Sequence, residues 1–580
     1  MSYINFESKY VKYPHTSVKG HSASQGYAAI KEELQKNIKE NTVLVFDFYP
    51  GVREDEVMQL INALQPNTCI RTLDIFKDSE CISEQMKYHL TDDRVFGKMY
   101  YGDFIDFMDE GKLKEAQEIV QKASGLTIVY GCGASLVTKG DILVYFDLAR
   151  WEIQMRYRAG MGNFKCENHD EDILRKYKRA FFIEWRIADK HKQRGFEHFD
   201  YVVDTNKEND PKMISGDTFR ESLKQLVRRP FRSVPYFDPG VWGGQWMKEV
   251  CGLDASKSNY AWSFDGVPEE NSILFDYDGV SFELPAMDAV LYQPKELLGG
   301  KVFARFGAEF PIRFDFLDTM EGQPLSLQVH PLCEYIKKNF GMSYTQDESY
   351  YILDAKEDAC VYLGLNENIN ATEMIDDLRI AQDGEVAFDA EKYINKFPAK
   401  KHDHFLIPAG TCHCSGSGAM VLEISATPYI FTFKLWDWDR LGMDGRPRPV
   451  HIEHGKEVIQ WDSTTPWVEE HLVNAMYDVE DEQNGCRCEH TGLHELEFIE
   501  TRRYTMDAIS HHKTNNNVNM LNLIDGKEAI IESPTNAFEP FVVHYAETFI
   551  IPASIDEYTI RPYGTSEGEE IKVLKAYVRN

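Results

Sequence analysis

The sequence lacks the features that mark several large classes of protein. No run approaches the roughly 18 uninterrupted apolar residues of a membrane span. The opening stretch, MSYINFESKYVKYPH, has no apolar segment of the kind found in a secretory signal peptide. The 11 cysteines form no CxxC pair, and we interpret this odd, scattered set as reduced thiols. Together these absences predict a cytoplasmic protein.

Basic residues are also scarce. There are 63 Lys and Arg against 94 Asp and Glu, which gives a net charge of −31. Such an excess of negative charge repels nucleic acids and anionic membrane surfaces, so we expect neither as a partner. An anionic substrate would need a local cluster of basic residues. At about 100–200 residues per domain, the 580 residues predict about three domains.

Residues 1–230 alternate short apolar strands with helical stretches. The apolar runs at 42–49 and 141–149 predict buried strands, and EDEVMQLINALQ has helical spacing. This alternation is typical of an open α/β sheet. The turn in VLVFDFYPGVREDEV contains no GxxxxGK[ST], so a phosphate-binding loop and its lysine are absent from the sequence.

From residue 231 onward the sequence becomes β-rich. Short runs of Val, Ile, Phe and Tyr are broken by Gly, Pro and Asp, as in sandwiches and barrels. A segment at about 368–397 has helical periodicity and predicts a small helical insertion. The whole chain is therefore predicted to be multidomain, with a β-rich domain at 231–455 and a second at 456–580.

An internal repeat supports two related β-barrels. FLIPAG at 405–410 recurs as FIIPAS at 549–554, and each is followed by a further apolar strand. Aligning the two segments places Glu557 at the position of His413, and no QxH precedes it. We therefore expect the second barrel to bind no metal.

One constellation in the first barrel suggests chemistry. LSLQVHP places Gln328 and His330 two residues apart, so both side chains leave the same face of a strand. Glu348 opens the next predicted strand, and His413 lies in the turn-rich segment IPAGTCHCSGSG. These oxygen and nitrogen donors suit a borderline divalent ion such as zinc, with a position left open for substrate. Each histidine taken alone is more often a structural residue than a metal ligand.

These segments, together with TFKLWDWDR, resemble the signature motifs of the type I mannose-6-phosphate isomerases, which are zinc-dependent cupins. VWGGQWMKE, AWSF and FPIRFDFLD follow in that family's order, and the resemblance extends from about Pro235 to the C-terminus. It implies two cupin domains, that is, jelly-roll barrels. It also implies one Zn²⁺ per chain, with Gln328, His330, Glu348 and His413 as the ligands.

The resemblance implies that mannose 6-phosphate and fructose 6-phosphate are interconverted through a cis-enediol. Such chemistry needs an electrophile for the developing oxyanion and a base near the carbon acid. Arg440 resembles the family's active-site arginine, and Glu423 is our candidate base, with a structural carboxylate as the alternative. Candidate substrate-binding residues are Ser326, Lys434 and Arg313.

Two positions depart from the family pattern. Asp315 and Gln346 stand where the family commonly has lysines associated with the phosphate end of the substrate. Arg313 shares a strand face with Asp315, and either replaces one lysine or pairs with that aspartate. The substrate is therefore mannose 6-phosphate, a related sugar phosphate or an unphosphorylated sugar. The alternative function is a non-catalytic sugar sensor built on an isomerase-like barrel.

In the N-terminal domain, DILVYFDLARWEIQMRYR and EWRIADKHKQR resemble the distal half of a P-loop sugar or nucleoside kinase. Arg150, Arg156 and Arg158 in the first of these segments form either an anion pocket or a solvated helix face. The resulting hypothesis is a degenerate kinase-like domain that serves regulation, ligand binding or assembly. The sequence does not define the oligomeric state.

Overall fold

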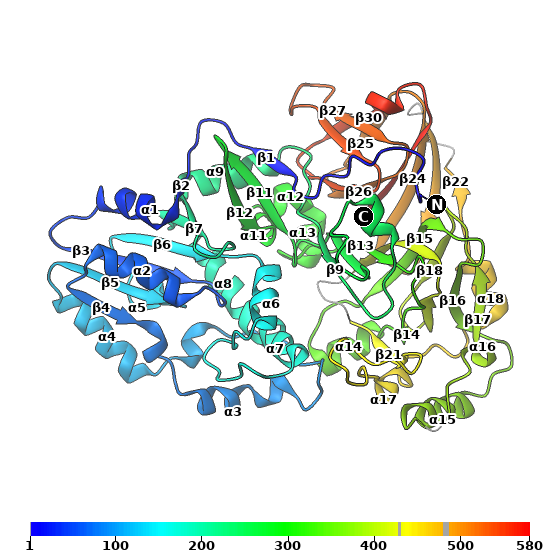
Figure 1. Ribbon diagram of the computed structural model, residues 1–580, viewed down its shortest axis with the longest axis horizontal. Helices are drawn as coiled ribbons and strands as arrows, with labels where there is room; N and C mark the ends of the chain where they lie inside the picture. Colours follow the sequence, from blue (N-terminus) through cyan, green and yellow to red (C-terminus); the bar gives the residue numbers. More distant parts are fainter. Residues whose placement is uncertain (1, 385, 427–430, 480–485, 580) are drawn as a thin grey trace. The chain divides into compact units, whose positions relative to one another are not determined.

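The computed structural model describes residues 2–384, 386–426, 431–479 and 486–579 (Figure 1). The chain forms two compact units. The β-rich unit consists of Met1–Pro14, Val227–Asn271 and Pro294–Asn580, and the α/β unit consists of His15–Leu226 and Ser272–Gln293. The domain limits suggested by the sequence remain predictions. No helix in the described ranges is both long and apolar enough to cross a membrane.

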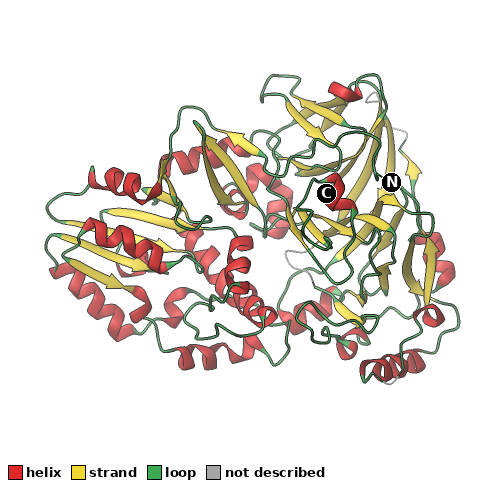
Figure 2. Ribbon diagram, in the orientation of Figure 1, coloured by secondary structure: helices red, strands yellow, loops and turns green. Residues whose placement is uncertain are grey.

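The α/β unit contains a seven-stranded sheet in the order β2-β8-β7-β6-β3-β5-β4 (Figure 2). The five strands from β7 to β4 are parallel. Parallel sheets are covered on both faces, which explains the continuous apolar runs in the two strands predicted from the sequence. The strands are β2 (Ser24–Gln25), β3 (Thr42–Phe48), β4 (Thr68–Arg71), β5 (Leu126–Gly131), β6 (Ile142–Asp147), β7 (Tyr201–Asp204) and β8 (Lys212–Ser215).

Helices alternate with these strands, and a separate three-stranded sheet, β1-β11-β12, completes the unit. That sheet comprises β1 (His15–Ser17), β11 (Ser272–Tyr277) and β12 (Val280–Pro285). The helices are α1 (Gly26–Gln35), α2 (Glu54–Leu64), α3 (Ser79–Leu90), α4 (Glu110–Lys122), α5 (Ala134–Val137), α6 (Arg150–Arg158), α7 (Ile173–Arg179), α8 (Trp185–Gly195), α9 (Gly216–Leu226) and α11 (Met287–Tyr292).

Buried charges pair with one another at the carboxyl ends of β3 and β6. His191 Nε2 lies 2.8 Å from an Asp47 carboxylate oxygen. Lys192 Nζ lies 3.0 Å from Asp147 and 2.6 Å from Asp288. A phosphate-binding loop would follow β3 at this edge of the sheet, but the sequence has none there.

The arginines of α6 are mostly structural. Arg150 is 4% exposed and pairs with Asp189, and Arg156 is 2% exposed and donates to the main-chain oxygen of Gly51 at 2.8 Å. Arg158 is exposed. Arg150 and Arg156 therefore do not belong to a solvated helix face, the second of the two alternatives that the sequence left open.

The β-rich unit contains two sandwiches. The first sandwich pairs a six-stranded sheet, β18-β15-β20-β13-β10-β9, with a five-stranded sheet, β17-β16-β19-β14-β21. Its strands are β9 (Tyr236–Asp238), β10 (Trp262–Gly266), β13 (Arg313–Asp318), β14 (Leu327–Val329), β15 (Asp347–Ala355), β16 (Cys360–Leu365), β17 (Ile394–Pro398), β18 (His404–Ile407), β19 (His413–Ser415), β20 (Ala419–Ala426) and β21 (Phe433–Trp436).

The second sandwich pairs a six-stranded sheet, β22-β23-β24-β31-β26-β29, with a four-stranded sheet, β25-β30-β27-β28. Apolar side chains from both sheets form one core. Its strands are β22 (Tyr477–Asp478), β23 (Arg487–Gly492), β24 (Ile499–Met506), β25 (Ser510–Lys513), β26 (Asn519–Asp525), β27 (Glu528–Glu532), β28 (Phe541–His544), β29 (Thr548–Ile551), β30 (Glu557–Pro562) and β31 (Ile571–Val578).

The two sandwiches have the same topology. Taken in chain order, β9, β10 and β13 to β20 of the first sandwich match β22 to β31 of the second, and each pair holds the same place in its sheet. Only β21 has no counterpart in the described residues. The repeat detected in the sequence corresponds to β18 and β29. The sheets are open in both sandwiches.

The register of the repeat differs from the sequence alignment by one residue. Inside the first sandwich, His413 of β19 faces Gln328 of β14. In the corresponding pair of the second sandwich, Tyr558 of β30 belongs to the core and faces His512 of β25. Glu557, which the alignment placed at this position, is only half-buried. The loops before β19 and β30 span 408–412 and 552–556 and are equal in length, but His413 is the first residue of β19 whereas Tyr558 is the second residue of β30. The inward position therefore lies one residue further along β30.

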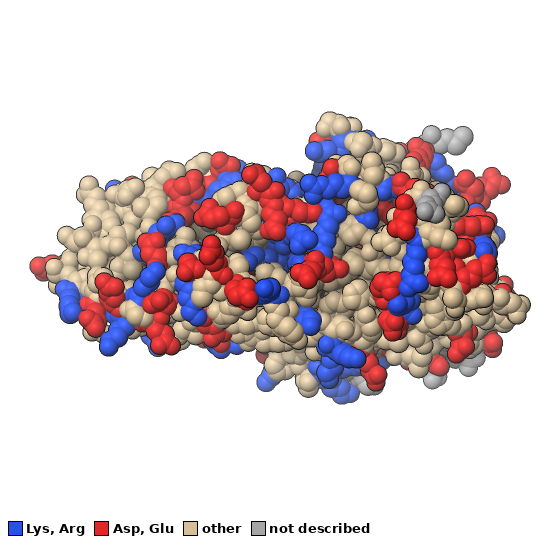
Figure 3. All heavy atoms as spheres, turned by 90° about the horizontal axis from the view of Figure 1, so that it is seen from below, with Lys and Arg blue, Asp and Glu red and all other residues tan. Residues whose placement is uncertain are grey.

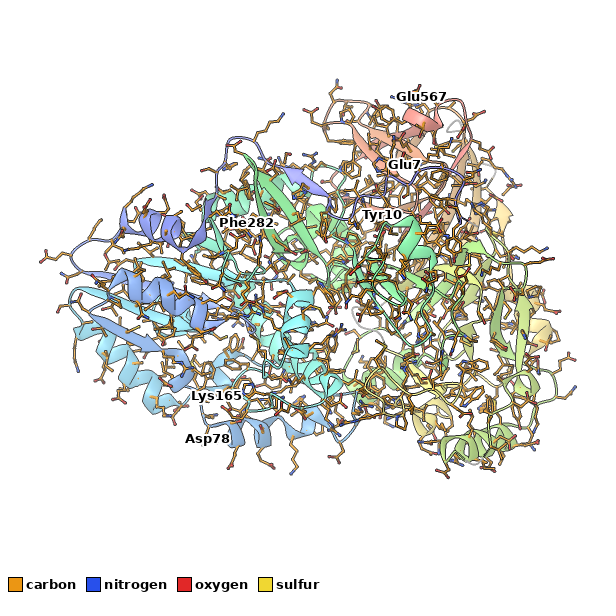
Figure 4. The ribbon with its side chains drawn as sticks, viewed as in Figure 1. Glu7, Tyr10, Asp78, Lys165, Phe282 and Glu567 are labelled. Atoms are coloured by element: carbon orange, nitrogen blue, oxygen red, sulfur yellow. The ribbon has the colours of Figure 1, made fainter. Side chains whose placement is uncertain are left out.

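Short helices and the N-terminal segment complete the β-rich unit. Tyr10, labelled in Figure 4, donates its hydroxyl to Asp265 of β10, and the Val11 N–H donates to Glu547 at 2.6 Å. The predicted helical insertion contains α15 and α16. The helices are α10 (Trp246–Val250), α12 (Pro294–Leu298), α13 (Gly300–Phe306), α14 (Cys333–Phe340), α15 (Ala371–Gln382), α16 (Ala390–Tyr393), α17 (Ile452–Gly455) and α18 (Thr465–His471).

The sandwiches meet where β15 and β18 of the first lie against β23 and β24 of the second. Arg503 of β24 donates to Glu489 at 2.8 Å and to the Tyr351 hydroxyl at 3.1 Å. His404 of β18 is fully buried, with its Nε2 2.8 Å from the Ser349 hydroxyl. Burial, and then the charge of Arg503, lower the pKa of His404 to about 3.

On the surface, basic side chains are interspersed among acidic ones over the face shown in Figure 3. All eleven cysteines lie in the described ranges, and no disulfide joins any two of them. Because acidic and basic side chains are mixed on the face shown in Figure 3, the net charge of −31 does not gather in a single acidic patch there.

Candidate metal centre

The first sandwich brings together the four side chains predicted as ligands. Gln328 on β14 faces His413 on β19 and, on its other side, Lys434 on β21. His330 follows directly after β14, and Glu348 is the second residue of β15 in the opposite sheet. The alternation of β14 sends Gln328 and His330 toward the same side, where they meet Glu348.

These side chains form one tight, buried cluster. His413 Nε2 lies 2.9 Å from Glu348 Oε1, and His330 Nε2 lies 3.1 Å from Glu348 Oε2. Gln328 Nε2 lies 3.2 Å from His413 Nε2. The two histidines and the glutamate are 0% exposed, and their ligand atoms all lie within 4.8 Å of one another.

Backbone carbonyls orient both imidazoles. His330 Nδ1 lies 2.9 Å from the main-chain oxygen of Phe431, and His413 Nδ1 lies 2.8 Å from that of Thr411. A carbonyl oxygen only accepts, so each Nδ1 carries a hydrogen and each Nε2 is left to point toward Glu348. Imidazoles that bind metals are held in this way.

Gln346 fixes the glutamate. Its Nε2 donates to Glu348 Oε2 at 2.9 Å, and its Oε1 accepts from the Phe431 N–H at 2.6 Å. The sequence marked Gln346 only as the replacement of a lysine, and its role in positioning Glu348 was missed. The spacing of the two residues on one extended stretch was the available signal, since residues two apart share a face.

The donor set fits a divalent cation. Burial alone would raise the pKa of Glu348, but His330 and His413 outweigh it and hold this pKa well below its usual range. His330 Nε2 and Glu348 Oε1 have no hydrogen-bond partner of good geometry within the described residues. A buried carboxylate, two oriented imidazoles and an amide oxygen are a set that zinc accepts.

A second layer of charge adjoins the cluster. Glu423 of β20 faces Asp315 of β13 and Tyr350 of β15. Burial and the negative charge of Glu348 raise the pKa of Glu423 well above its usual range, and burial raises that of Asp315 to about 7. Arg313 Nη2 lies 3.0 Å from Asp315 Oδ2. Of the two alternatives from the sequence, the structure shows the pairing of Arg313 with Asp315.

Ser326 and Arg440 belong to a separate network around Asp437. The Ser326 hydroxyl donates to Asp437 at 2.6 Å, and Arg440 Nη2 donates to the same oxygen at 2.8 Å. Arg448 Nη1 lies 3.0 Å from Asp437 and 3.1 Å from the Ser326 hydroxyl. Two guanidinium groups therefore surround one carboxylate next to the beginning of β14.

These features define a β-sandwich protein with a buried carboxylate–imidazole cluster. Over 343 residues the chain is 23% identical to the mannose-6-phosphate isomerase ManA of Bacillus subtilis (strain 168), covering 59% of this chain and 96% of that protein. It is 29% identical over 223 residues to the mannose-6-phosphate isomerase of Streptococcus mutans, covering 38% and 64% of the two chains. The chain is thus homologous to mannose-6-phosphate isomerases over about 60% of its length.

Two further comparisons concern the fold and the N-terminal part. The crystal structure of the mannose 6-phosphate isomerase from Bacillus subtilis superposes with a TM-score of 0.47 and 20% identity, covering 60% of this chain and 99% of that one. Residues 26–228 match a family model described as a domain of unknown function, DUF8485.

Proposed function

We propose that the first sandwich is a zinc-dependent aldose–ketose isomerase that interconverts mannose 6-phosphate and fructose 6-phosphate, or a related sugar, through a cis-enediol. One observation carries the proposal: a fully buried carboxylate lies within 3.1 Å of two oriented imidazoles. The homology to mannose-6-phosphate isomerases supports the same reaction class.

Gln328, His330, Glu348 and His413 would hold the ion. When bound, zinc supplies the Lewis acid that polarises the carbonyl and hydroxyl oxygens of a sugar. The protein contributes the orientation of the ligands: two backbone carbonyls fix the imidazoles, and Gln346 fixes the glutamate.

We propose that Glu423 moves the proton between C1 and C2. It lies beside Glu348 in the buried layer formed by β13, β15 and β20. A carboxyl whose pKa is raised is a stronger base once ionised, which favours abstraction of a proton from carbon.

The network around Asp437 is our candidate for the anionic end of the substrate. Arg440 and Arg448 provide two positive charges against one carboxylate, and Ser326 adds a hydroxyl. Lys434 lies on the neighbouring strand. Arg440 in this position would also steady the enediolate charge, the role that the family resemblance implies.

An unphosphorylated sugar is the second candidate substrate. Asp315 and Gln346 leave the cluster with fewer cations than the family pattern has, and the Arg313 charge is already paired with Asp315. Because the buried layer is rich in carboxylates, it repels a phosphate dianion, whereas a neutral sugar experiences no such repulsion.

A coupled assay tests these proposals. The protein is stripped of metal with a chelator, and turnover of mannose 6-phosphate and of mannose is measured before and after zinc is restored. We expect turnover only in the presence of zinc. Bound zinc without turnover of either sugar, combined with measurable sugar binding, would instead support the sensor.

For the α/β unit we propose a kinase-like domain that lacks the phosphate loop and serves regulation, ligand binding or assembly. Support comes from its parallel sheet, in which β5 lies between β3 and β4 and the chain then crosses to β6 and β7 on the other side of β3. Equilibrium dialysis with ATP provides the test, and nucleotide binding with no phosphoryl transfer to sugars is the expected result.

A further inference from the structure

The second sandwich contains a cavity of about 630 Å³ at one end of its interior. This volume lies within the range of pockets that hold small metabolites. The inward positions of β31 show how it forms: Ile571 and Val573 belong to the apolar core, whereas Lys575 and Tyr577 line the cavity. The interior is therefore apolar over most of its depth and polar at its mouth.

The cavity takes the place that the metal centre has in the first sandwich. His512 faces Tyr558 across β25 and β30, as Gln328 faces His413 across β14 and β19. The Tyr558 hydroxyl donates to Asn519 Oδ1 at 3.0 Å. At the corresponding place in the first sandwich, His413 Nε2 lies 2.9 Å from Glu348 Oε1. His512, Tyr558 and Asn519 all line the cavity.

Charge is inverted between the two places. In the first sandwich Glu423 faces Asp315, whereas in the second sandwich Lys575 faces Arg502 across the corresponding strands β31 and β24. Two carboxylates are thus replaced by two cations. Lys575 is 5% exposed, and its ammonium lies 4.5 Å from the centre of the Tyr504 ring.

The polar end of the second interior is positive on balance. Glu500 accepts from Arg502 at 2.8 Å and lies 3.2 Å from Arg579 Nε, so two guanidinium groups meet its single charge. Among the described residues that line this end of the cavity, Lys575 and Arg579 stand against Glu500. At the rim, Lys513 faces Glu557, and these two charges offset each other.

Two buried polar atoms in the cavity wall lack hydrogen-bond partners among the described residues. They are His512 Nδ1 and Asn517 Oδ1, on side chains that are 3% and 1% exposed. The other ring nitrogen of His512 lies 2.9 Å from the Ser510 hydroxyl. A buried acceptor without a partner is unfavourable, and hydroxyl groups of a ligand would satisfy it.

We propose that this cavity is a second ligand site, which binds a small anion carrying hydroxyl groups, of the sugar-phosphate class, without a metal ion. Lys575 attracts the anionic group, His512 and Asn517 accept from hydroxyl groups, and the ring of Tyr577 borders the sugar. This site is independent of the isomerase activity proposed for the first sandwich.

Calorimetric titration of the full chain with glucose 6-phosphate tests the site. The His413→Asn variant, in which the metal centre is disrupted, is expected to keep one binding site. Adding Lys575→Met should weaken binding at least tenfold, whereas adding Lys513→Met at the rim should change it less than twofold. Unchanged affinity in the Lys575→Met variant, or loss of all binding in the His413→Asn variant, would overturn the proposal.

Two other probes define the ligand class. Glucose should bind at least tenfold more weakly than glucose 6-phosphate, and inorganic phosphate should also bind at least tenfold more weakly. Equal binding of glucose would refute the anionic group, and equal binding of phosphate would refute the role of the hydroxyl groups.

A measurement on the unmodified chain covers the case in which the Lys575→Met variant does not fold. Pyridoxal 5′-phosphate condenses with a lysine amine with loss of water, and borohydride then reduces the imine to a stable adduct. Peptide mass spectrometry should find Lys575 labelled, and glucose 6-phosphate should reduce that labelling while leaving Lys513 labelled. Labelling of Lys575 that glucose 6-phosphate does not reduce would contradict the site.

Discussion

Ten strands of the second sandwich repeat the order of ten strands of the first, yet the inward side chains at the same end of the two interiors differ in kind. In the first sandwich a carboxylate and two imidazoles converge, with Glu423 and Asp315 behind them. In the second, Lys575 and Arg502 stand at the positions of those two carboxylates. The shared topology therefore fixes where a site forms, whereas a few inward residues decide whether it attracts cations or anions.

The largest effect is expected from a substitution that disrupts the metal centre of the first sandwich. His413→Ala removes one of four ligands and should abolish stoichiometric zinc binding together with isomerase turnover, because three donors leave an open and weak site. Metal content is measured by mass spectrometry after dialysis. The matched change, His512→Ala in the second sandwich, should leave the zinc content at that of the unmodified chain. A full equivalent of zinc in His413→Ala would refute the ligand assignment.

A smaller effect separates proton transfer from metal binding. Glu423→Gln should lower kcat by about 10²–10⁴, the usual contribution of a general base, while the zinc content stays the same. Lys572→Met, on the outward face of the corresponding strand β31, serves as the control and should leave kcat unchanged. If Glu423→Gln lost zinc as well, Glu423 would belong to the metal site and not to the proton transfer.

The border between the sandwiches should respond to acid. The pKa of His404 is about 3 in the folded protein and about 6.5 in the unfolded chain. Below pH 6.5, His404 binds a proton in the unfolded chain but stays neutral in the folded protein. The free energy of unfolding therefore falls as the pH drops toward 3. The loss from this group approaches about 1.4 kcal/mol per pH unit.

Urea unfolding at pH 7 and pH 4.5 measures this loss, and His404→Gln should remove part of it. His511→Gln, at an exposed position of the second sandwich, is the control. Equal acid sensitivity of the His404→Gln variant and the unmodified chain would exclude His404 as the cause.

The smallest expected effect concerns the substrate's phosphate. Gln346→Lys restores a cation of the family pattern and should lower KM for mannose 6-phosphate about threefold, since charge-assisted contacts to phosphate are favourable. KM for mannose is the control, because it changes only through the loss of the hydrogen bonds from Gln346 to Glu348 and Phe431. A KM for the phosphosugar that does not fall relative to the KM for mannose would indicate that the natural substrate carries no phosphate at this end.

Strand alternation made part of the site predictable. The two-residue spacing of Gln328 and His330 placed both on one face, and the structure brings Glu348 and His413 to that face. The latter two lie on separate elements, and only the family resemblance linked them to the first two. The α/β pattern of the N-terminal part was equally visible, because buried parallel strands appear as continuous apolar runs.

Other features depend on contacts that spacing does not encode. From the sequence, Arg313 could either replace a family lysine or pair with Asp315. The structure shows the pair, and which of the two forms depends on what surrounds both side chains. The inward residue Tyr558 is the second residue of β30, whereas His413 is the first residue of β19, and an alignment of the two repeats does not reveal this offset of one residue. The Asp437 network joins Ser326 to residues more than 100 positions away, a pairing that no local pattern indicates.

The discontinuous α/β unit has a consequence for biosynthesis. Its strands β11 and β12, and Asp288 with its contact to Lys192, come from a stretch that follows Val227–Asn271 of the other unit. While the ribosome is still translating that intervening stretch, β1 has no β11 to pair with and Lys192 lacks one of its two carboxylate partners. The nascent chain must therefore wait for residue 293 to emerge from the exit tunnel before its first unit is complete.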